Sequence, residues 1–160
     1  MIWCRSRTAD LGVISVERFA TMVLALVLLP VTAQAHVTVS PNESTPGKTE
    51  TYTFNVPTEG KSATTAVELE VPPEMTIISV NGPPTAYTLT RSADRIVGIA
   101  WRVNISPGSA QQLGIVARNP TEPSFGVQWK VHQRFADGTS ADWVDPPPAR
   151  PAPRTRVLPK

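Results

Sequence analysis

The sequence predicts an all-β sandwich, because short runs of strand-forming residues are separated by turn residues throughout the chain. The 160 residues include 17 prolines, and proline breaks the interior of helices. Runs rich in valine, threonine and isoleucine recur at about the spacing expected for the strands of a sandwich. No segment of helical length repeats its apolar residues with a period of about 3.6 positions. We therefore expect a single domain of about seven to nine strands.

Residues 1–35 have the pattern of a secretory signal peptide. Three arginines and an apolar stretch precede Ala33 and Ala35, whose small side chains form a cleavage site of the A-x-A type. The apolar stretch is too short for a membrane helix, which needs about 20 apolar residues. We expect this leader to be removed, whether translation starts at the first residue or at Met22. The mature chain then begins at His36 and works in the periplasm or outside the cell.

The remaining chain predicts about nine strands, each bounded by turn residues. Pro46-Gly47 is one of these turn signals, and Asp137-Gly138 is typical of a hairpin. Together the strands define a β-sandwich domain over residues 36–145. They are expected at 36–40, 49–56, 64–71, 76–80, 85–90, 95–103, 111–118, 125–134 and 139–144.

Residues 146–160 are expected to form a proline-rich, disordered tail. The segment begins Pro-Pro-Pro-Ala-Arg-Pro-Ala-Pro-Arg, which is of low complexity and is not expected to pack. No second long apolar stretch follows the leader. The sequence therefore predicts no membrane anchor for the mature protein.

Charge and cysteine content exclude several classes of function. Fifteen basic against 13 acidic residues give a net charge of +2 without the basic patch that nucleic-acid binding requires. The only cysteine, Cys4, is lost with the leader, which excludes disulfides, a thiol nucleophile and a cysteine metal site. The common motifs of hydrolases, metalloproteases and nucleotide-binding enzymes are missing. We expect a protein that is not an enzyme and that binds no nucleic acid.

His36 is the most informative residue, because the expected cleavage makes it the N-terminus. A terminal histidine offers two nitrogens, its α-amine and its imidazole, which together can chelate one metal ion. The amine titrates near pH ~8 and can therefore lose its proton to a metal at neutral pH. Nitrogen pairs of this kind suit Cu(II). The alternative is that the signal peptidase leaves a histidine in first place by chance.

Glu59 is the expected partner of His36. If strands 36–40 and 49–56 pair in antiparallel fashion, the start of the first lies beside the end of the second, which leads into Glu59. A carboxylate at that edge can supply an oxygen ligand and offset the charge of the cation. The alternative is an ordinary loop carboxylate. Other candidates for an oxygen ligand are Glu43, Glu50, Glu68 and Glu70.

His132 is the only other histidine of the mature chain, and it allows two interpretations. Paired with His36, it would complete a two-histidine site like those of copper oxygenases or electron-transfer proteins. However, strand alternation places it on the face opposite Val131 and Gln133. That position favours a half-buried structural residue.

Trp143 also allows two interpretations. Trp101 and Trp129 stand within apolar strands and are expected in the core. Trp143 instead closes the last predicted strand, close to where the loops begin. Its indole can cover the open face of a bound cation and exclude water, or it can pack in the core like the others.

Several segments resemble the YcnI-like copper-binding domain family. The resemblance covers about 36–145, nearly the whole mature domain. One departure is Gly82-Pro-Pro-Thr-Ala-Tyr87, which stands where relatives often have Gly-Trp. The segments that carry the resemblance are Ala35-His36-Val-Thr-Val-Ser-Pro41, Pro46-Gly47, Tyr52-Thr-Phe54, Val56-Pro57-Thr-Glu59, Thr64-Thr65 and Gln133-Arg-Phe-Ala-Asp137-Gly138, followed by Trp143.

The resemblance implies a secreted or periplasmic β-sandwich that takes part in copper homeostasis, and we expect it to be of the immunoglobulin or cupredoxin type. It further implies Cu(II) held by a single-histidine brace, which consists of the amine and imidazole of His36 together with Glu59. The tryptophan that lies near the metal in the family falls on Trp143. The resemblance assigns no ligand role to His132.

We therefore expect a copper chaperone or buffer that captures Cu(II) at the mature N-terminus. Ligand exchange would pass the ion to a copper transporter or another periplasmic copper protein. One alternative is a metal-free β-sandwich that binds another protein through its loops or its tail. A second alternative is a copper oxygenase that uses His36 and His132.

Overall fold

The computed structural model of the chain describes residues 36–146 and 150–159. The signal peptide predicted over 1–35 lies outside the described residues, as do positions 147–149 and 160. Within the described ranges the chain forms strands and one short 3₁₀ helix, η2 (Pro84–Ala86), without any α-helix. The all-β prediction is confirmed. No helix in this part of the chain has the length and apolar character needed to cross a membrane.

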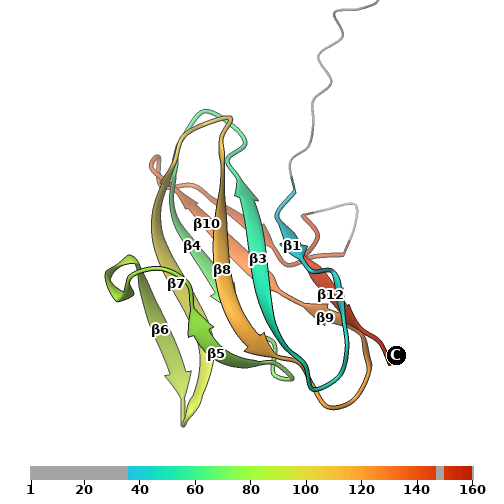
Figure 1. The fold of residues 1–160 in the computed structure, drawn as a ribbon. Coiled ribbons are helices and arrows are strands. Elements are labelled where there is room, and N and C mark those ends of the chain that lie inside the picture. Colours follow the sequence, from blue (N-terminus) through green and yellow to red (C-terminus); the bar gives the residue numbers. More distant parts are fainter. Residues whose placement is uncertain (1–35, 147–149, 160) are drawn as a thin grey trace, which may run out of the picture. The chain divides into compact units, whose positions relative to one another are not determined.

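The strands form three sheets (Figure 1). The first has the order β1 (Thr38–Ser40), β3 (Thr49–Pro57), β8 (Ala110–Arg118) and β5 (Thr76–Val80). The second has the order β11 (Ser140–Trp143), β10 (Lys130–Phe135), β4 (Thr64–Glu70), β7 (Arg95–Ile105) and β6 (Tyr87–Ser92). The third is small and consists of β2 (Glu43–Ser44), β12 (Arg154–Val157) and β9 (Ser124–Gln128).

The core lies inside this sandwich, where every second residue of the long strands is buried. In β3 the inward residues Tyr52, Phe54 and Val56 are at most 2% exposed, while Thr51, Thr53 and Asn55, which alternate with them, are exposed or half-buried. The ring centroids of Tyr52 and Phe54 lie 5.2 and 5.4 Å from that of Trp129. Trp129 and Trp101 are buried, which confirms their predicted place in the core. Aromatic groups of this size contribute much of the apolar area that the fold removes from water.

The first strand brings His36, the expected start of the mature chain, to the end of β3. β1 and β3 pair in antiparallel fashion, with Thr38 opposite Asn55. Continued by two positions, this register places His36 level with Pro57, two residues before Glu59. The pairing on which the sequence argument for Glu59 depended is therefore present.

The predicted strand 125–134 is two strands that belong to different sheets. β9 ends at Gln128 and β10 begins at Lys130, so that the chain passes from the third sheet to the second at Trp129. The main-chain amide of Trp129 donates to the carbonyl of Pro153 at 2.9 Å, and its indole nitrogen donates to Thr155 Oγ1 at 3.1 Å. Both partners stand far along the chain, and for that reason the local pattern does not reveal the break.

The prediction of a disordered tail is wrong for residues 150–159. Arg154–Val157 forms β12, which pairs in antiparallel fashion with β9 and in parallel with β2. Thr155 and Val157 are fully buried, whereas Arg154 and Arg156 are exposed. The preceding prolines do not prevent this, because they stand ahead of the strand and remove no ladder hydrogen bond from it. Four residues that alternate between exposed and buried positions form a strand here, because β9 and β2 pair with them on both sides.

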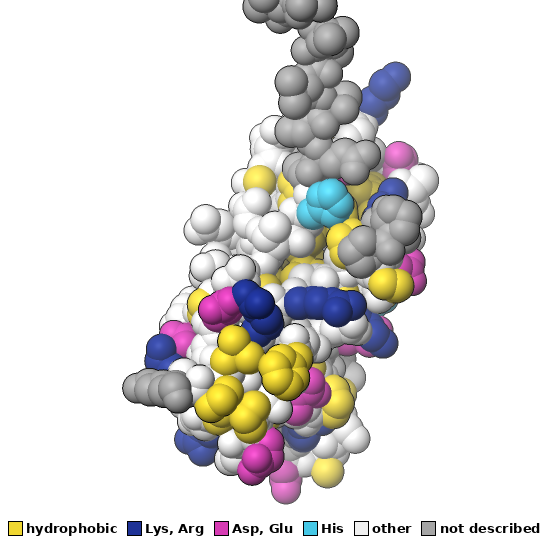
Figure 2. Space-filling model, turned by 90° about the vertical axis from the view of Figure 1, so that its right-hand side faces the viewer, with side chains coloured by type: hydrophobic (Ala, Val, Ile, Leu, Met, Phe, Trp, Pro, Cys, Tyr) yellow, Lys and Arg dark blue, Asp and Glu magenta, His cyan; other side chains and the backbone are white. Residues whose placement is uncertain are grey.

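The exposed side of this segment is mixed in character. Figure 2 views the side of the molecule on which β12 and β9 lie in Figure 1. Basic side chains lie across its middle, and hydrophobic side chains gather below them. Arg156 pairs with Glu43 of the neighbouring strand β2. Arg154 and Arg156 therefore lie on the outer face of the third sheet, and the buried residues Thr155 and Val157 lie on its inner face.

Replacing Thr155 by valine tests the packing of β12. The substitution keeps the shape of the side chain but leaves the indole N–H of Trp129 unpaired in the core, which costs about 1–3 kcal/mol. We expect the free energy of unfolding, measured with urea, to fall by about 2 kcal/mol. The matched substitution Thr76→Val, at an exposed position of β5, should change it by less than about 0.5 kcal/mol. Equally small effects at both positions would contradict the packing described for β12.

Candidate metal centre

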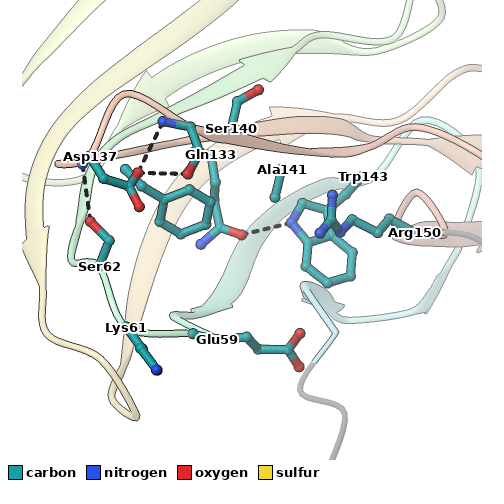
Figure 3. Close-up of a pocket in the computed structure, with 12 residues that line it drawn as sticks. Glu59, Lys61, Ser62, Gln133, Asp137, Ser140, Ala141, Trp143 and Arg150 are labelled. Atoms are coloured by element: carbon teal, nitrogen blue, oxygen red, sulfur yellow. Dashed lines mark hydrogen bonds between the residues drawn. The ribbon is translucent and has the colours of Figure 1, made fainter.

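Three predicted site residues lie at one edge of the domain. His36 precedes β1, Glu59 follows β3 by two residues, and Trp143 is the last residue of β11. The rings of His36 and Trp143 meet edge to face, with centroids 5.7 Å apart and an interplanar angle of 63°. Glu59 and Trp143 line the same pocket, which has a volume of about 310 Å³ (Figure 3). Glu59 and Trp143 thus line one pocket, and the imidazole of His36 contacts the same indole.

Trp143 is both a core residue and a neighbour of His36. Only 4% of its surface is exposed, and it stands opposite Val131 on the inner face of the second sheet. Its indole Nε1 donates to Gln133 Oε1 at 2.7 Å. The two interpretations of this tryptophan are therefore compatible, because one edge of the ring is held in the core while the ring also borders His36.

Gln133 is a residue of this region that the sequence argument did not single out. It is 1% exposed, and its amide makes hydrogen bonds at both ends. Its Nε2 donates to the carbonyl of Pro57 at 2.8 Å and to Thr64 Oγ1 at 3.1 Å, while its Oε1 accepts from Trp143. The side chain therefore ties the indole to the end of β3, from which Glu59 follows. A glutamine predicted to face a core is the signal that could have found it, because buried amides need partners.

The main chain in front of Glu59 is held firmly. Thr58 is 2% exposed, and its amide donates to the carbonyl of Ser109 at 2.8 Å. Its own carbonyl accepts from the amide of Gly108 at 3.0 Å. The hydroxyls of Thr58 and Thr64 share a hydrogen bond of 2.6 Å. Three hydrogen bonds of Thr58 therefore fix the residue from which the chain continues to Glu59.

Charged groups complete the lining of the pocket. Lys61 and Arg150 contribute two cations, and Figure 3 shows the Arg150 side chain alongside the indole of Trp143. Asp137 also lines the pocket, but its carboxylate accepts hydrogen bonds from the hydroxyl and the amide of Thr139 at 2.6 and 3.0 Å. These hydrogen bonds lower the pKa of Asp137 and keep the carboxylate within its own turn.

The other predicted carboxylates lie outside this pocket and pair with basic groups of their own. Glu50 accepts a hydrogen bond from the Ser44 hydroxyl at 2.6 Å and pairs with Lys48 at 2.9 Å, and both contacts lower its pKa. The remaining ion pairs are Glu43 with Arg156, Glu68 with Arg134, and Glu70 with Lys130 and His132. Of the candidates considered, Glu59 is the one that borders the pocket.

His132 lies on the outer face of β10, opposite the face that carries Gln133 and meets Trp143. Its Nδ1 is 2.7 Å from Asp142 Oδ1, and its Nε2 is 3.0 Å from Glu70 Oε1. Burial lowers the pKa of His132, but the hydrogen bonds and charges of the two carboxylates outweigh it and raise the pKa above 6.5. The prediction of a half-buried structural residue is confirmed. A two-histidine copper site is not formed, because strand alternation points this imidazole away from the pocket.

The donor set of the described residues limits what kind of metal site they can form. Over 36–146 and 150–159, no three side chains of His, Cys, Asp or Glu cluster so as to hold a metal ion. One imidazole and one carboxylate at the pocket edge therefore need a further donor. The α-amine of a chain that begins at His36 is a donor of the required chemistry, since it belongs to the same residue as the imidazole.

Comparison with known proteins shows which sequences the chain resembles. Residues 36–88 match the profile of a domain of unknown function, DUF1775. Over 124 residues the chain is 32% identical to the copper-binding protein CutI of Bacillus subtilis (strain 168). The chain therefore contains a segment of the DUF1775 (YcnI) type and is similar to CutI beyond that segment. The match with CutI covers 75% of this chain and 60% of CutI, so that the chain spans less than two thirds of that relative.

A solved structure is similar to this chain over most of its length. The crystal structure of an uncharacterized protein from Nocardia farcinica matches it with a TM-score of 0.62 and 27% sequence identity. The match covers 76% of this chain and 97% of the other. That protein is described as having an immunoglobulin-like fold. The fold of this chain is therefore immunoglobulin-like, as the sequence predicts.

Replacing Gln133 by leucine tests the buried amide. The substitution nearly conserves volume but leaves the Trp143 indole N–H and the Pro57 carbonyl without their partner, and each unpaired group costs about 1–3 kcal/mol. We expect the free energy of unfolding in urea to fall by about 3 kcal/mol. Gln128→Leu, at an exposed position of β9, serves as the control and should have little effect. A loss of equal size in the control would show that the hydrogen bonds of Gln133 are not its cause.

The stability of the protein should depend on pH through His132. Because folding raises its pKa, its contribution is fully present below the unfolded value of about 6.5 and is lost as pH rises through the folded value. Glu70 changes the stability with pH in the opposite direction. Burial raises its pKa, but His132 and Lys130 lower it below 4.5, so that its contribution is lost in acid.

We expect the stability difference between the wild type and His132→Gln to shrink between about pH 6.5 and pH 8. The change should be about 1 kcal/mol or less, because these groups are partly exposed. Urea unfolding at a series of pH values measures the difference. A value that stays constant across this range would contradict the raised pKa.

Proposed function

We propose that this protein binds Cu(II) at its mature N-terminus and acts as an extracytoplasmic copper chaperone or buffer, without enzymatic activity. The observation that carries the proposal is that the imidazole of His36 contacts Trp143, which lines one pocket together with Glu59. The relative CutI is named as a copper-binding protein, which supports the choice of metal. The proposal includes removal of residues 1–35, because the α-amine of His36 is free only after that cut.

The chemistry of the donor set fits Cu(II). The amine and the imidazole of His36 supply two nitrogens, Glu59 supplies an oxygen, and sites of this nitrogen and oxygen type favour Cu(II) among the divalent metals of the first row. Soft sulfur ligands suit Cu(I) instead. The mature chain would have no cysteine, and Met75, its one methionine, is fully buried. Cu(II) is therefore the oxidation state that these residues would hold.

The surroundings suit a site that both captures and releases its ion. The carboxylate of Glu59 offsets part of the positive charge, and the indole of Trp143 borders the imidazole on its buried side. Glu59 is exposed and His36 is half-buried, which leaves one side open to an incoming ligand. Transfer would proceed by ligand exchange with a copper transporter or another extracytoplasmic copper protein.

Three forms of the protein test this proposal. They are the mature chain that begins at His36, a chain that keeps Ala33-Gln34-Ala35 ahead of it, and Glu59→Gln in the mature chain. Three retained residues are used because one or two would create new chelates from the amine, the intervening amides and the imidazole. We expect the mature chain to bind one Cu(II), and the other two forms to bind it at least about tenfold more weakly. Competition with a chelator and electron paramagnetic resonance measure the binding.

Glu74→Gln, at an exposed position ahead of β5, is the matched control and should bind copper like the mature chain. Equally tight binding by the mature and the extended forms would contradict the brace. Lack of stoichiometric copper in the mature protein would favour a metal-free module that binds another protein.

A further inference from the structure

The pocket beside the candidate metal site is larger than the metal donors need. Its volume of about 310 Å³ is enough for a small organic group as well as water. One wall is the inner face of the second sheet, with Gln133 and Trp143. The opposite wall is the loop that carries Glu59 and Lys61, and Arg150 closes a third side. The space therefore adjoins the proposed copper ligand and also contains two cations.

The groups of the pocket that remain available to a ligand are positively charged. The amide of Gln133 is committed to Pro57, Thr64 and Trp143, and the carboxylate of Asp137 is committed to its own turn. Neither Lys61 nor Arg150 takes part in the ion pairs between described residues. A ligand that enters the pocket therefore meets these two cations at its rim.

The main chain holds Arg150 in its place. The amide of Asp145 donates to the carbonyl of Arg150 at 3.2 Å, and the amide of Ala152 donates to the carbonyl of Asp145 at 3.2 Å. Asp145 also forms a bridge with Pro151. These contacts fix the main chain of Arg150 beside Asp145, and Figure 3 shows the arginine side chain beside Trp143. The guanidinium is exposed and lines the pocket from this fixed main-chain position.

The proposed copper site needs one more ligand. Cu(II) prefers a tetragonal arrangement, and the amine, imidazole and Glu59 carboxylate supply three donors. An ion of charge +2 with the Glu59 carboxylate keeps a net charge of +1. Lys61 and Arg150 add two positive charges and Asp137 one negative charge, so that the pocket with its ion carries +2. An anion is therefore the favoured occupant of the pocket. Among anions, carboxylates match the planar fork of an arginine with two parallel hydrogen bonds.

We propose that this pocket is a carboxylate-binding subsite, in which Arg150 and Lys61 hold a carboxylate that completes the coordination of copper. This inference rests on the proposed function. One carboxylate oxygen donates a lone pair in place of a departing water molecule, and no electron is transferred. The carboxylate can belong to a small organic acid or to an acidic side chain of a partner protein. In the second case it is the first incoming ligand of the exchange by which the ion leaves.

Titration with acetate tests the subsite. The mature protein is loaded with one Cu(II), and sodium acetate is added while sodium perchlorate keeps the ionic strength constant. We expect a saturable change in the copper absorption band and in the electron paramagnetic resonance spectrum. Arg150→Gln should raise the acetate dissociation constant about tenfold, since it removes a bidentate partner, and Lys61→Gln should raise it less. The matched control Arg91→Gln, at an exposed position of β6, should leave it unchanged.

The same samples separate failure of the subsite from failure of the proposed function. Absence of copper binding before acetate is added would contradict the proposed function. Stoichiometric copper with no saturable response to acetate would mean that water holds the open position, and would overturn the subsite. An unchanged acetate constant in Arg150→Gln would overturn the role of this arginine. Folding of each variant is checked by circular dichroism, and Arg150→Lys, which keeps the charge, should recover part of the affinity.

A capped peptide with a single glutamate distinguishes the two sources of the carboxylate. Tighter binding of the peptide than of acetate would support an acidic side chain of a partner protein. Tighter binding of acetate would support a small organic acid. Binding of neither would overturn the inference.

Discussion

The buried amide of Gln133 is the interaction on which the candidate site depends. Burying an amide is unfavourable unless its donors and acceptor are paired, and this one reaches Pro57, Thr64 and Trp143. These partners belong to β3, β4 and β11, so that the satisfied amide fixes the distance between two sheets at one edge. The position of the indole and the point from which Glu59 projects are set together. Such hydrogen bonds specify the register of the strands that they join, because a shift of any of these strands would leave an unpaired group in the core.

The alternation of strand β10 separates two polar clusters that contain the functional candidates. Gln133 points inward, to Trp143 and the pocket, while His132 points outward, to Glu70 and Asp142. A strand with a period of about two residues cannot bring adjacent side chains to the same face. The outward histidine is therefore a charged link between three strands, and the inward face remains free of competing imidazoles. Among the described residues, this separation leaves His36 as the imidazole that contacts Trp143.

Both ends of the described chain contribute to the region around the pocket. His36 opens the first strand, and Arg150 stands just ahead of the segment that forms β12. That segment is fixed because Thr155 accepts the indole hydrogen of Trp129 and Val157 is fully buried. A proline-rich sequence is thus held by partners that its own composition does not indicate. The candidate anion-binding arginine stands at the start of this docked segment, since its carbonyl accepts from the amide of Asp145 and the next residue, Pro151, forms a bridge with Asp145.

The sequence by itself determined the class of fold, most strand positions, and the expectation that His36 and Glu59 share one edge. These features follow from local alternation and from the pairing of consecutive strands, which need no knowledge of distant partners. The tertiary structure alone decided the partners of Gln133, which stands 76 positions from Pro57, and the place of Arg154–Val157 in a sheet. Hydrogen bonds between residues so far apart form only when the sheets have packed. For that reason composition and periodicity predicted the strands but not the side chains that join them.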